Sequence, residues 1–108
     1  MIFACLVSCI GRHQVDVWKT ITIAPEESIT VKEVKAPVSL EIKNLSDGVL
    51  TIVSQMDMPK SLMPQSVLIY RLPKKNGFTL ENKNPDPISI YLHYASSRPV
   101  LINNKELR

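Results

Sequence analysis

Beyond residue 13 the chain alternates between apolar and polar positions with a period of two. Successive side chains of a strand point to opposite faces, so this period is typical of half-buried β-strands. The apolar positions of these runs are Val15, Val17, Ile21, Ile23, Ile29, Val31, Val38, Leu40, Ile42, Val67, Ile69, Phe78, Leu80, Ile88, Ile90, Leu92 and Tyr94. Residues 49–53 form a nearly continuous apolar run, which predicts a strand buried on both faces, and residues 100–102 predict a last strand.

Prolines and turn-forming residues mark the boundaries of these runs. All eight prolines lie at the edges of the runs or between them, as expected because proline cannot donate to a strand ladder. Residues 44–48 and 74–77 have turn compositions. The longest irregular stretch, 55–65, predicts a loop or a single helical turn. With no helical stripe and no internal repeat, we predict an all-β fold, a single antiparallel β-sandwich or small barrel of seven or eight short strands.

Composition and charge narrow the possible functions. A chain of 108 residues is sufficient for one domain with a single core. The net charge is +3, and the charges of both signs are interspersed, with no run longer than two of one sign. Nucleic-acid-binding proteins usually gather their basic residues into a patch or stripe, so we expect no nucleic-acid partner. No stretch approaches the roughly 18 to 20 apolar residues of a transmembrane helix.

The first nine residues end in Leu6-Val7-Ser8-Cys9. This ending resembles the lipobox of bacterial lipoproteins, and the resemblance implies a lipid on Cys9 and an envelope location facing the periplasm or the cell surface. It divides the chain into a signal segment, residues 1–8, and a sandwich domain, residues 9–108. No Lys or Arg precedes Arg12, so the resemblance implies a clipped signal whose true start lies upstream. The alternative is a cytoplasmic protein in which residues 2–7 form a core strand.

Candidate chemistry is sparse. The chain has two histidines, His13 and His93, and no glycine-rich phosphate loop, nucleophile elbow or evident carboxylate pair. We therefore expect no enzyme, no catalytic residue, no metal and no cofactor. Asn44-Leu45-Ser46 matches the N-glycosylation sequon on a predicted turn.

The methionine-containing segment offers one alternative to this expectation. Thioethers are soft ligands for Cu(I), so Met56, Met58 and Met63 with His93 would suit a small periplasmic ligand or copper carrier. The competing interpretation is that methionine fills gaps where a loop closes the sandwich.

A small domain without catalytic groups on a lipid tether suggests a binding role. Only residues 10–13 separate Cys9 from the first strand, a leash of about 14 Å. By analogy with small sandwich lipoproteins of secretion systems, we predict a lipid-anchored binding or scaffolding component of a membrane-associated assembly with a protein partner. A soluble structural or interaction protein is the alternative. The candidate contact residues are Met56, Met58, Leu62, Met63, Tyr91 and His93.

Overall fold

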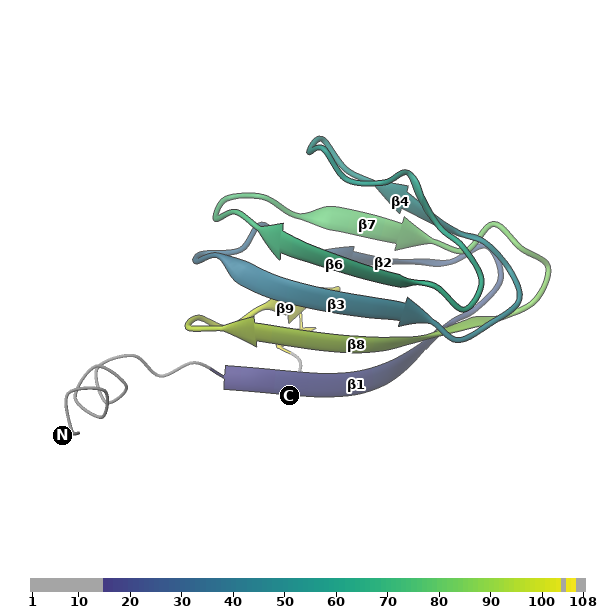
Figure 1. Ribbon diagram of the computed structural model, residues 1–108, viewed down its shortest axis with the longest axis horizontal. Helices are drawn as coiled ribbons and strands as arrows, with labels where there is room; N and C mark the ends of the chain where they lie inside the picture. Colours follow the sequence, from purple (N-terminus) through teal and green to yellow (C-terminus); the bar gives the residue numbers. More distant parts are fainter. Residues whose placement is uncertain (1–14, 104, 107–108) are drawn as a thin grey trace, which may run out of the picture.

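The computed structural model describes residues 15–103 and 105–106, and within these ranges the chain contains strands and no helix. The strands are β1 (Val15–Ile23), β2 (Ser28–Val31), β3 (Val38–Asn44), β4 (Leu50–Val53), β5 (Ser61–Leu62), β6 (Val67–Leu72), β7 (Phe78–Glu81), β8 (Ile88–Ser96), β9 (Leu101–Ile102) and β10 (Lys105–Glu106). They form two antiparallel sheets that pack face to face (Figure 1). The prediction of an all-β sandwich is confirmed.

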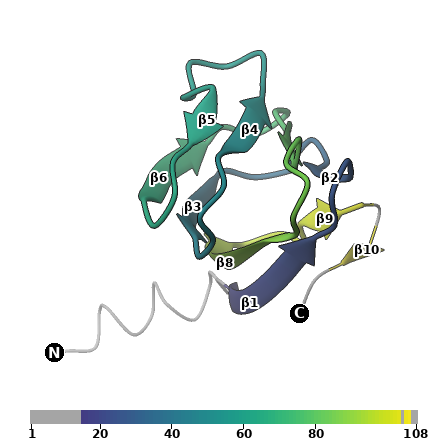
Figure 2. The same cartoon turned by 90° about the vertical axis from the view of Figure 1, so that its right-hand side faces the viewer.

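The strand order identifies the type of sandwich. One sheet has the order β1-β8-β3-β6, and the other has the order β10-β9-β2-β7-β4-β5. The first eight strands therefore pair as β1 with β8, β2 with β7, β3 with β6 and β4 with β5, like a long two-stranded ribbon that folds back and forth between two sheets. This is the topology of a jelly roll. Figure 2 shows the two sheets around a common interior, with β9 and β10 extending the second sheet beside β2.

The core follows the predicted alternation in most strands, but not in β6. In β3, Val38, Leu40 and Ile42 are buried, while the polar residues between them are exposed. The run at residues 49–53 differs from its prediction, because Val49 and Val53 are 38% and 48% exposed. Only one face of each sheet is covered by the other sheet, so even an apolar run is buried on one side only. The prediction of burial on both faces is wrong.

The segment 55–65 contains no helical turn. It contains the short strand β5, which pairs with β4 in the register Leu50↔Leu62. A strand of two residues shows no period, so the hydrophobic pattern did not reveal it.

The corners of the ribbon carry residues with positive φ that are not glycine. Glu26 has a φ of 67°, Gln65 of 61° and Lys75 of 70°. Each of these residues makes the same pair of backbone hydrogen bonds with the opposite strand of the ribbon. The amide of Glu26, for example, donates to Asn82 O, and the amide of Asn82 donates to Glu27 O. This is the pattern of a G1 β-bulge, which bends a strand pair and increases its twist. These bulges are where the ribbon crosses from one sheet to the other.

Position 65 allows a test of this backbone constraint. We expect Gln65→Val to lower the free energy of unfolding by about 1–2 kcal/mol relative to Gln65→Gly, because a β-branched residue is strained at positive φ and glycine is not. Both variants lose the hydrogen bonds from Gln65 Nε2 to Leu45 O and Ser46 O, so their difference isolates the backbone effect. Urea denaturation followed by circular dichroism measures it. Equal stability of the two variants would contradict the role of the bulge.

Candidate functional site

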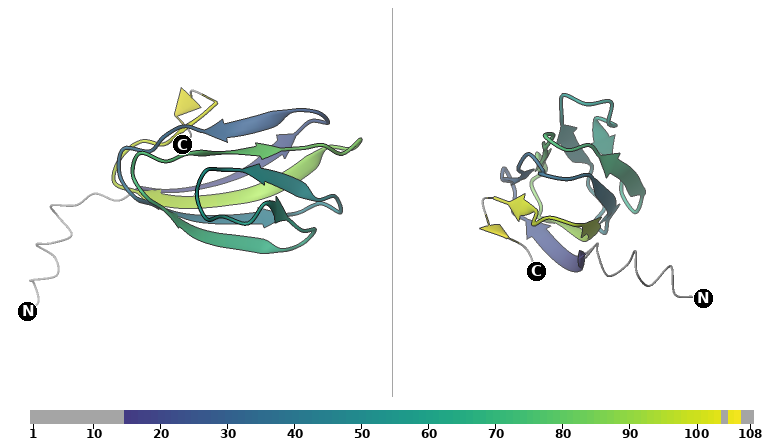
Figure 3. Two further views of the ribbon diagram at one scale, coloured as in Figure 1. Left: turned by 90° about the horizontal axis from the view of Figure 1, so that it is seen from above. Right: turned by 90° about the vertical axis from the view of Figure 1, so that its left-hand side faces the viewer.

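Four connections meet at one end of the sandwich, because consecutive strands run in opposite directions (Figure 3). They are β1–β2 (24–27), β3–β4 (45–49), β5–β6 (63–66) and β7–β8 (82–87). The exposed charged residues of these connections are Glu26, Glu27, Asp47, Lys83 and Asp86. Lys83 Nζ lies 3.7 Å from Glu81 Oε1. We call this the acidic end, because its connections carry four carboxylates and one lysine, and that lysine is close to Glu81.

A buried asparagine closes the β3–β4 connection. Asn44 is fully buried, and its Nδ2 donates to Gly48 O at 2.8 Å and to Leu62 O at 3.1 Å. Its Oδ1 accepts from the amide of Ser46 at 2.9 Å. The amide nitrogen of the sequon is therefore committed to two carbonyls inside the fold. Glycan attachment at Asn44 is incompatible with this structure.

A second buried asparagine repeats the arrangement at the β7–β8 connection. Asn82 is 1% exposed, and its Nδ2 donates to Ile23 O and to Asp86 O, both at 2.9 Å. Its Oδ1 accepts from the amide of Asn84 at 2.9 Å. In both connections the asparagine, at position i, accepts from the amide of residue i+2 and donates to the carbonyl of residue i+4. It also donates to a carbonyl at the end of a strand in the other sheet. These two loops are thus fixed from within rather than by their own turn propensity.

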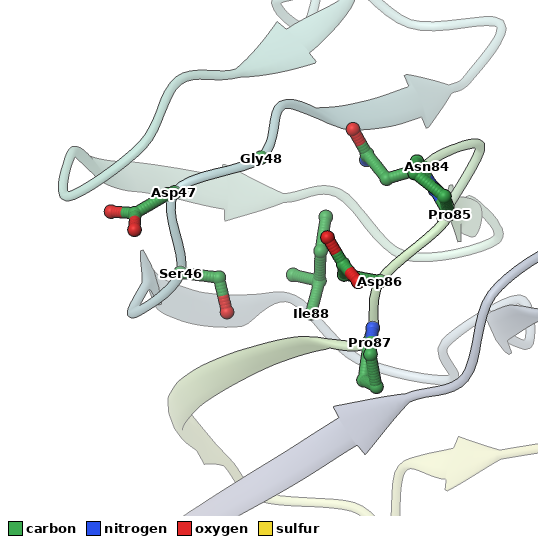
Figure 4. Close-up of a pocket in the computed structure, with 8 residues that line it drawn as sticks. All are labelled: Ser46, Asp47, Gly48, Asn84, Pro85, Asp86, Pro87 and Ile88. Carbon is green, nitrogen blue, oxygen red and sulfur yellow. The ribbon is translucent and has the colours of Figure 1, made fainter.

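A cavity of about 400 Å³ lies between the two asparagine-closed loops (Figure 4). It is lined by Ser46, Asp47, Gly48, Asn84, Pro85, Asp86, Pro87 and Ile88. Two hydrogen bonds link its walls: Asn84 Nδ2 donates to Val49 O at 2.8 Å, and the amide of Ser89 donates to Ser46 Oγ at 2.9 Å. The cavity is therefore built from loops that are tied both internally and to each other.

The polar groups of this cavity are mainly hydrogen-bond acceptors. The side chains of Asp86 and Asn84 point toward the space between the loops, while that of Asp47 points outward (Figure 4). Asn84 uses its Nδ2 within the fold, and its Oδ1 accepts from no residue in the part of the chain that the structure describes. Pro85, Pro87 and Ile88 add apolar surface, and no lining residue is basic. Across the described ranges, no group of three or more His, Cys, Asp or Glu is placed to hold a metal ion.

The predicted contact residues Tyr91 and His93 lie elsewhere, on the outer face of the first sheet. His93 Nε2 is 3.1 Å from Asp16 Oδ1, and its Nδ1 is 3.7 Å from Glu41 Oε1. The ring of Trp18, from the neighbouring strand, is stacked parallel to His93 with centroids 4.7 Å apart. The solvent-facing placement of this pair agrees with the sequence pattern, and its role in partner contact stays a prediction.

The methionine segment is largely part of the core. Met58 and Leu62 are 8% and 4% exposed, Met56 packs against the core, and Met63 is 55% exposed. The candidate contact residues Met58 and Leu62 are thus buried in the core, and the role of this segment in partner contact stays a prediction. The segment flanks β5 in the second sheet, whereas His93 lies on the outer face of the first sheet. The methionine thioethers and the His93 imidazole therefore lie apart, and the structure does not form the Cu(I) site that combines them.

The lipobox-like residues lie outside the described part of the chain. Cys9, and with it the division into residues 1–8 and 9–108, therefore stays a prediction, as do the envelope location and the protein partner. Searching the described residues for a helix long and apolar enough to cross a membrane finds none.

Comparison with known proteins gives one informative result. No protein-family model matches the chain, and no curated protein matches it. A solved structure is similar: a sugar phosphate isomerase of the cupin superfamily from Silicibacter pomeroyi, with a TM-score of 0.61 and 12% sequence identity. The similarity covers 90% of this chain and 60% of that protein, so this chain spans less than two thirds of its neighbour's length. At this identity the likeness shows a shared fold.

This neighbour contradicts the function predicted from the sequence. The lipid-anchored scaffolding role was inferred by analogy with small sandwich lipoproteins of secretion systems, and the fold is shared with a cupin-superfamily enzyme instead. The fold analogy on which the scaffolding role rested is wrong, and the scaffolding role is corrected with it.

Sequence reasoning missed the residues that line the cavity, above all Ser46, Asn84 and Asp86. It identified residues 44–48 as a turn, and the spacing Asn-x-Ser-x-Gly and Asn-x-Asn-x-Asp was the available signal. An asparagine that accepts from the amide two residues on is a recognised local motif. The burial of both asparagines, and the cavity between their loops, required the tertiary structure.

Proposed function

We propose that the cavity at the acidic end binds a small, unphosphorylated polyhydroxylated molecule, such as a monosaccharide. The observation that carries the proposal is an acceptor-lined cavity of about 400 Å³ with apolar walls and no basic side chain. This volume lies within the range of small-molecule sites, which often occupy the mouths of β-barrels.

The chemistry of the walls matches that of a sugar. Ligand hydroxyls are donors for the Asp86 carboxylate and for Asn84 Oδ1, and hydrogen bonds to a charged acceptor are stronger than those to a neutral one. Ser46 Oγ already accepts from the amide of Ser89, so its hydroxyl hydrogen is free to donate to a ligand oxygen. The C–H faces of a sugar ring would pack against Pro85 and Pro87.

The electrostatics of this end favour a ligand without phosphate, unlike the neighbour, whose name describes a sugar phosphate as substrate. Asp47 and Asp86 line the cavity, and Glu26 and Glu27 lie in the β1–β2 connection at the same end. A phosphate group would meet these carboxylates with no basic residue on the cavity wall, and like charges repel at such distances. Asp86 is also the single carboxylate that points into the cavity, so the arrangement lacks a paired acid and base. We therefore propose binding without conversion.

Titration of the ¹⁵N-labelled full chain with glucose, glucosamine and glucose 6-phosphate tests the proposal. We expect amide shifts at Ser46, Gly48 and Asn84 with the first two sugars, tighter binding of the cationic glucosamine at low salt, and none of these shifts with the phosphate. Asp86→Asn should weaken glucosamine binding about tenfold, because a charge-assisted hydrogen bond is lost.

The matched control is Asp57→Asn, which removes an exposed carboxylate from the β4–β5 connection at the opposite end. It should leave the affinity for both sugars unchanged. Binding of glucose 6-phosphate as tight as that of glucosamine, or shifts confined to residues outside the cavity, would refute the proposal.

A further inference from the structure

The end of the sandwich opposite the cavity carries the opposite charge. Four connections meet there: β2–β3 (32–37), β4–β5 (54–60), β6–β7 (73–77) and β8–β9 (97–100). Their exposed cations are Lys32, Lys35, Lys60, Lys74, Lys75 and Arg98. The exposed carboxylates among them are Glu33 and Asp57. Among the described residues, none of the six cations forms an ion pair. We call this surface the basic end.

The two charged ends are far enough apart to act independently. Strand β8 runs nine residues between them, about 30 Å at roughly 3.3 Å per residue. Charges in physiological salt are screened over a Debye length of about 8 Å. A partner at the basic end therefore experiences attraction from the six cations and almost none of the repulsion from the acidic end.

We infer that the basic end docks onto an anionic lipid membrane and so points the cavity away from it. Basic residues brought close to an anionic membrane each strengthen binding, by about fivefold in affinity per residue. The six cations come from four separate loops at one tip of the molecule, an arrangement suited to a broad, flat surface. The opposite sign of the other end favours a single orientation, because the acidic end is repelled by the same membrane.

The path of the chain supports the same partner. β1 begins with Val15 at the basic end, since Val15 pairs with Ser96 next to the β8–β9 connection. Residues 1–14 therefore join the described domain at this end, and their sequence includes the apolar residues 2–7. A lipid on Cys9, as the sequence predicts, would hold this same end to the membrane.

Vesicle co-sedimentation of the full, unlipidated chain tests the inference. We expect binding to phosphatidylcholine vesicles containing 30% phosphatidylglycerol in 50 mM salt, loss of binding in 500 mM salt, and no binding to pure phosphatidylcholine. The triple variant Lys35→Gln, Lys60→Gln, Lys74→Gln should bind about a hundredfold more weakly. Hydrogen exchange on the vesicles should slow at residues 32–37 and 73–77 and stay unchanged at residues 45–49.

The matched control is the triple variant Lys19→Gln, Lys43→Gln, Lys83→Gln. It removes the same number of positive charges from positions outside the basic end. Both variants have a formal net charge of zero, starting from +3. The control should bind within about threefold of the unmodified chain, and thermal unfolding should show that both variants are folded. Equal weakening in the two variants, no binding to the anionic vesicles, or tighter binding to duplex DNA at the same salt would overturn the inference. None of these outcomes depends on whether the cavity binds a sugar.

Discussion

Replacing Asn82 by aspartate is expected to lower the free energy of unfolding by about 3–5 kcal/mol, a large fraction of the stability of a domain of this size. The change removes both side-chain donors, so the carbonyls of Ile23 and Asp86 lose their partners and face a carboxylate. Each buried polar group left unsatisfied costs about 1–3 kcal/mol. Because Asn44 makes the same bonds in the other loop, Asn44→Asp should have a similar effect.

The pH dependence of the Asn82→Asp variant distinguishes this explanation from a general loss of packing. Burial disfavours the charged form, so the pKa of the introduced carboxyl is raised in the folded state above its unfolded value. A group with a raised folded pKa stabilises the fold when protonated and loses that contribution as the pH rises. The deficit relative to the unmodified chain should therefore be smaller at pH 4 than at pH 8.

Asn76→Asp is the matched control for the asparagine variants. Its Nδ2 also donates to two carbonyls, those of Pro73 and Lys74, but the site is exposed to solvent. Water replaces the lost donors there, so the change should be within about 1 kcal/mol. Urea denaturation compares the three variants. A loss below about 1 kcal/mol for Asn82→Asp, or the same loss for all three variants, would show that the buried asparagines do not hold the loops.

The second large effect is expected at Gly77, where the chain crosses between sheets at the basic end. A Cβ at this position would lie 2.3 Å from Val31 O and 3.0 Å from Glu33 N, both backbone atoms. The backbone has little freedom to retreat, because Lys75 N donates to Val34 O at 2.7 Å and Val34 N donates to Asn76 O at 3.0 Å. We expect Gly77→Ala to lower the free energy of unfolding by about 2–4 kcal/mol.

Gly48→Ala provides the comparison, because its new Cβ would meet side-chain atoms instead. The nearest atoms belong to Asn84, at 3.0 Å. The Asn84 side chain can move more easily than a backbone, at the cost of weakening its hydrogen bond to Val49 O, so the expected loss is below about 1.5 kcal/mol. Thermal unfolding of both variants decides the point: if alanine is tolerated equally at the two positions, the close approach at Gly77 does not constrain the crossing.

The sheets were predictable from most strands long enough to show alternation. Strand β6 is an exception, because the predicted apolar positions Val67 and Ile69 are 46% and 76% exposed and Leu68 is buried in their place. Residues 38–42 and 88–94 alternate cleanly, and they form the central strands β3 and β8. The pattern failed at residues 49–53, where it suggested burial on both faces, and at the two-residue strand β5. In each case the local sequence does not indicate which face of a strand the other sheet covers, or which strand pairs with it.

The two asparagine-closed loops were beyond a search for repeats along the chain. In one corner the turn with Pro25 precedes its asparagine, Asn82, whereas in the other corner the turn with Pro64 follows its asparagine, Asn44. The order of turn and asparagine along the chain is therefore reversed between the two corners. In the first corner the N-terminal strand of the ribbon supplies the turn, and in the second corner the C-terminal strand supplies it. A repeat of fixed period does not exist in the sequence, although the hydrogen bonds in space are the same.

Sequence alone determined the longer strands of this protein, its net charge of +3 and the interspersion of charges of both signs. It contains no run of more than two basic residues, so a basic patch could assemble only in three dimensions. The tertiary structure assembles one. Antiparallel strands send alternate connections to opposite ends, so charges that alternate along the chain separate into an acidic end that holds the cavity and a basic end about 30 Å away. The physical reason is that the position of a loop depends on the direction of the strand before it, which only the fold assigns.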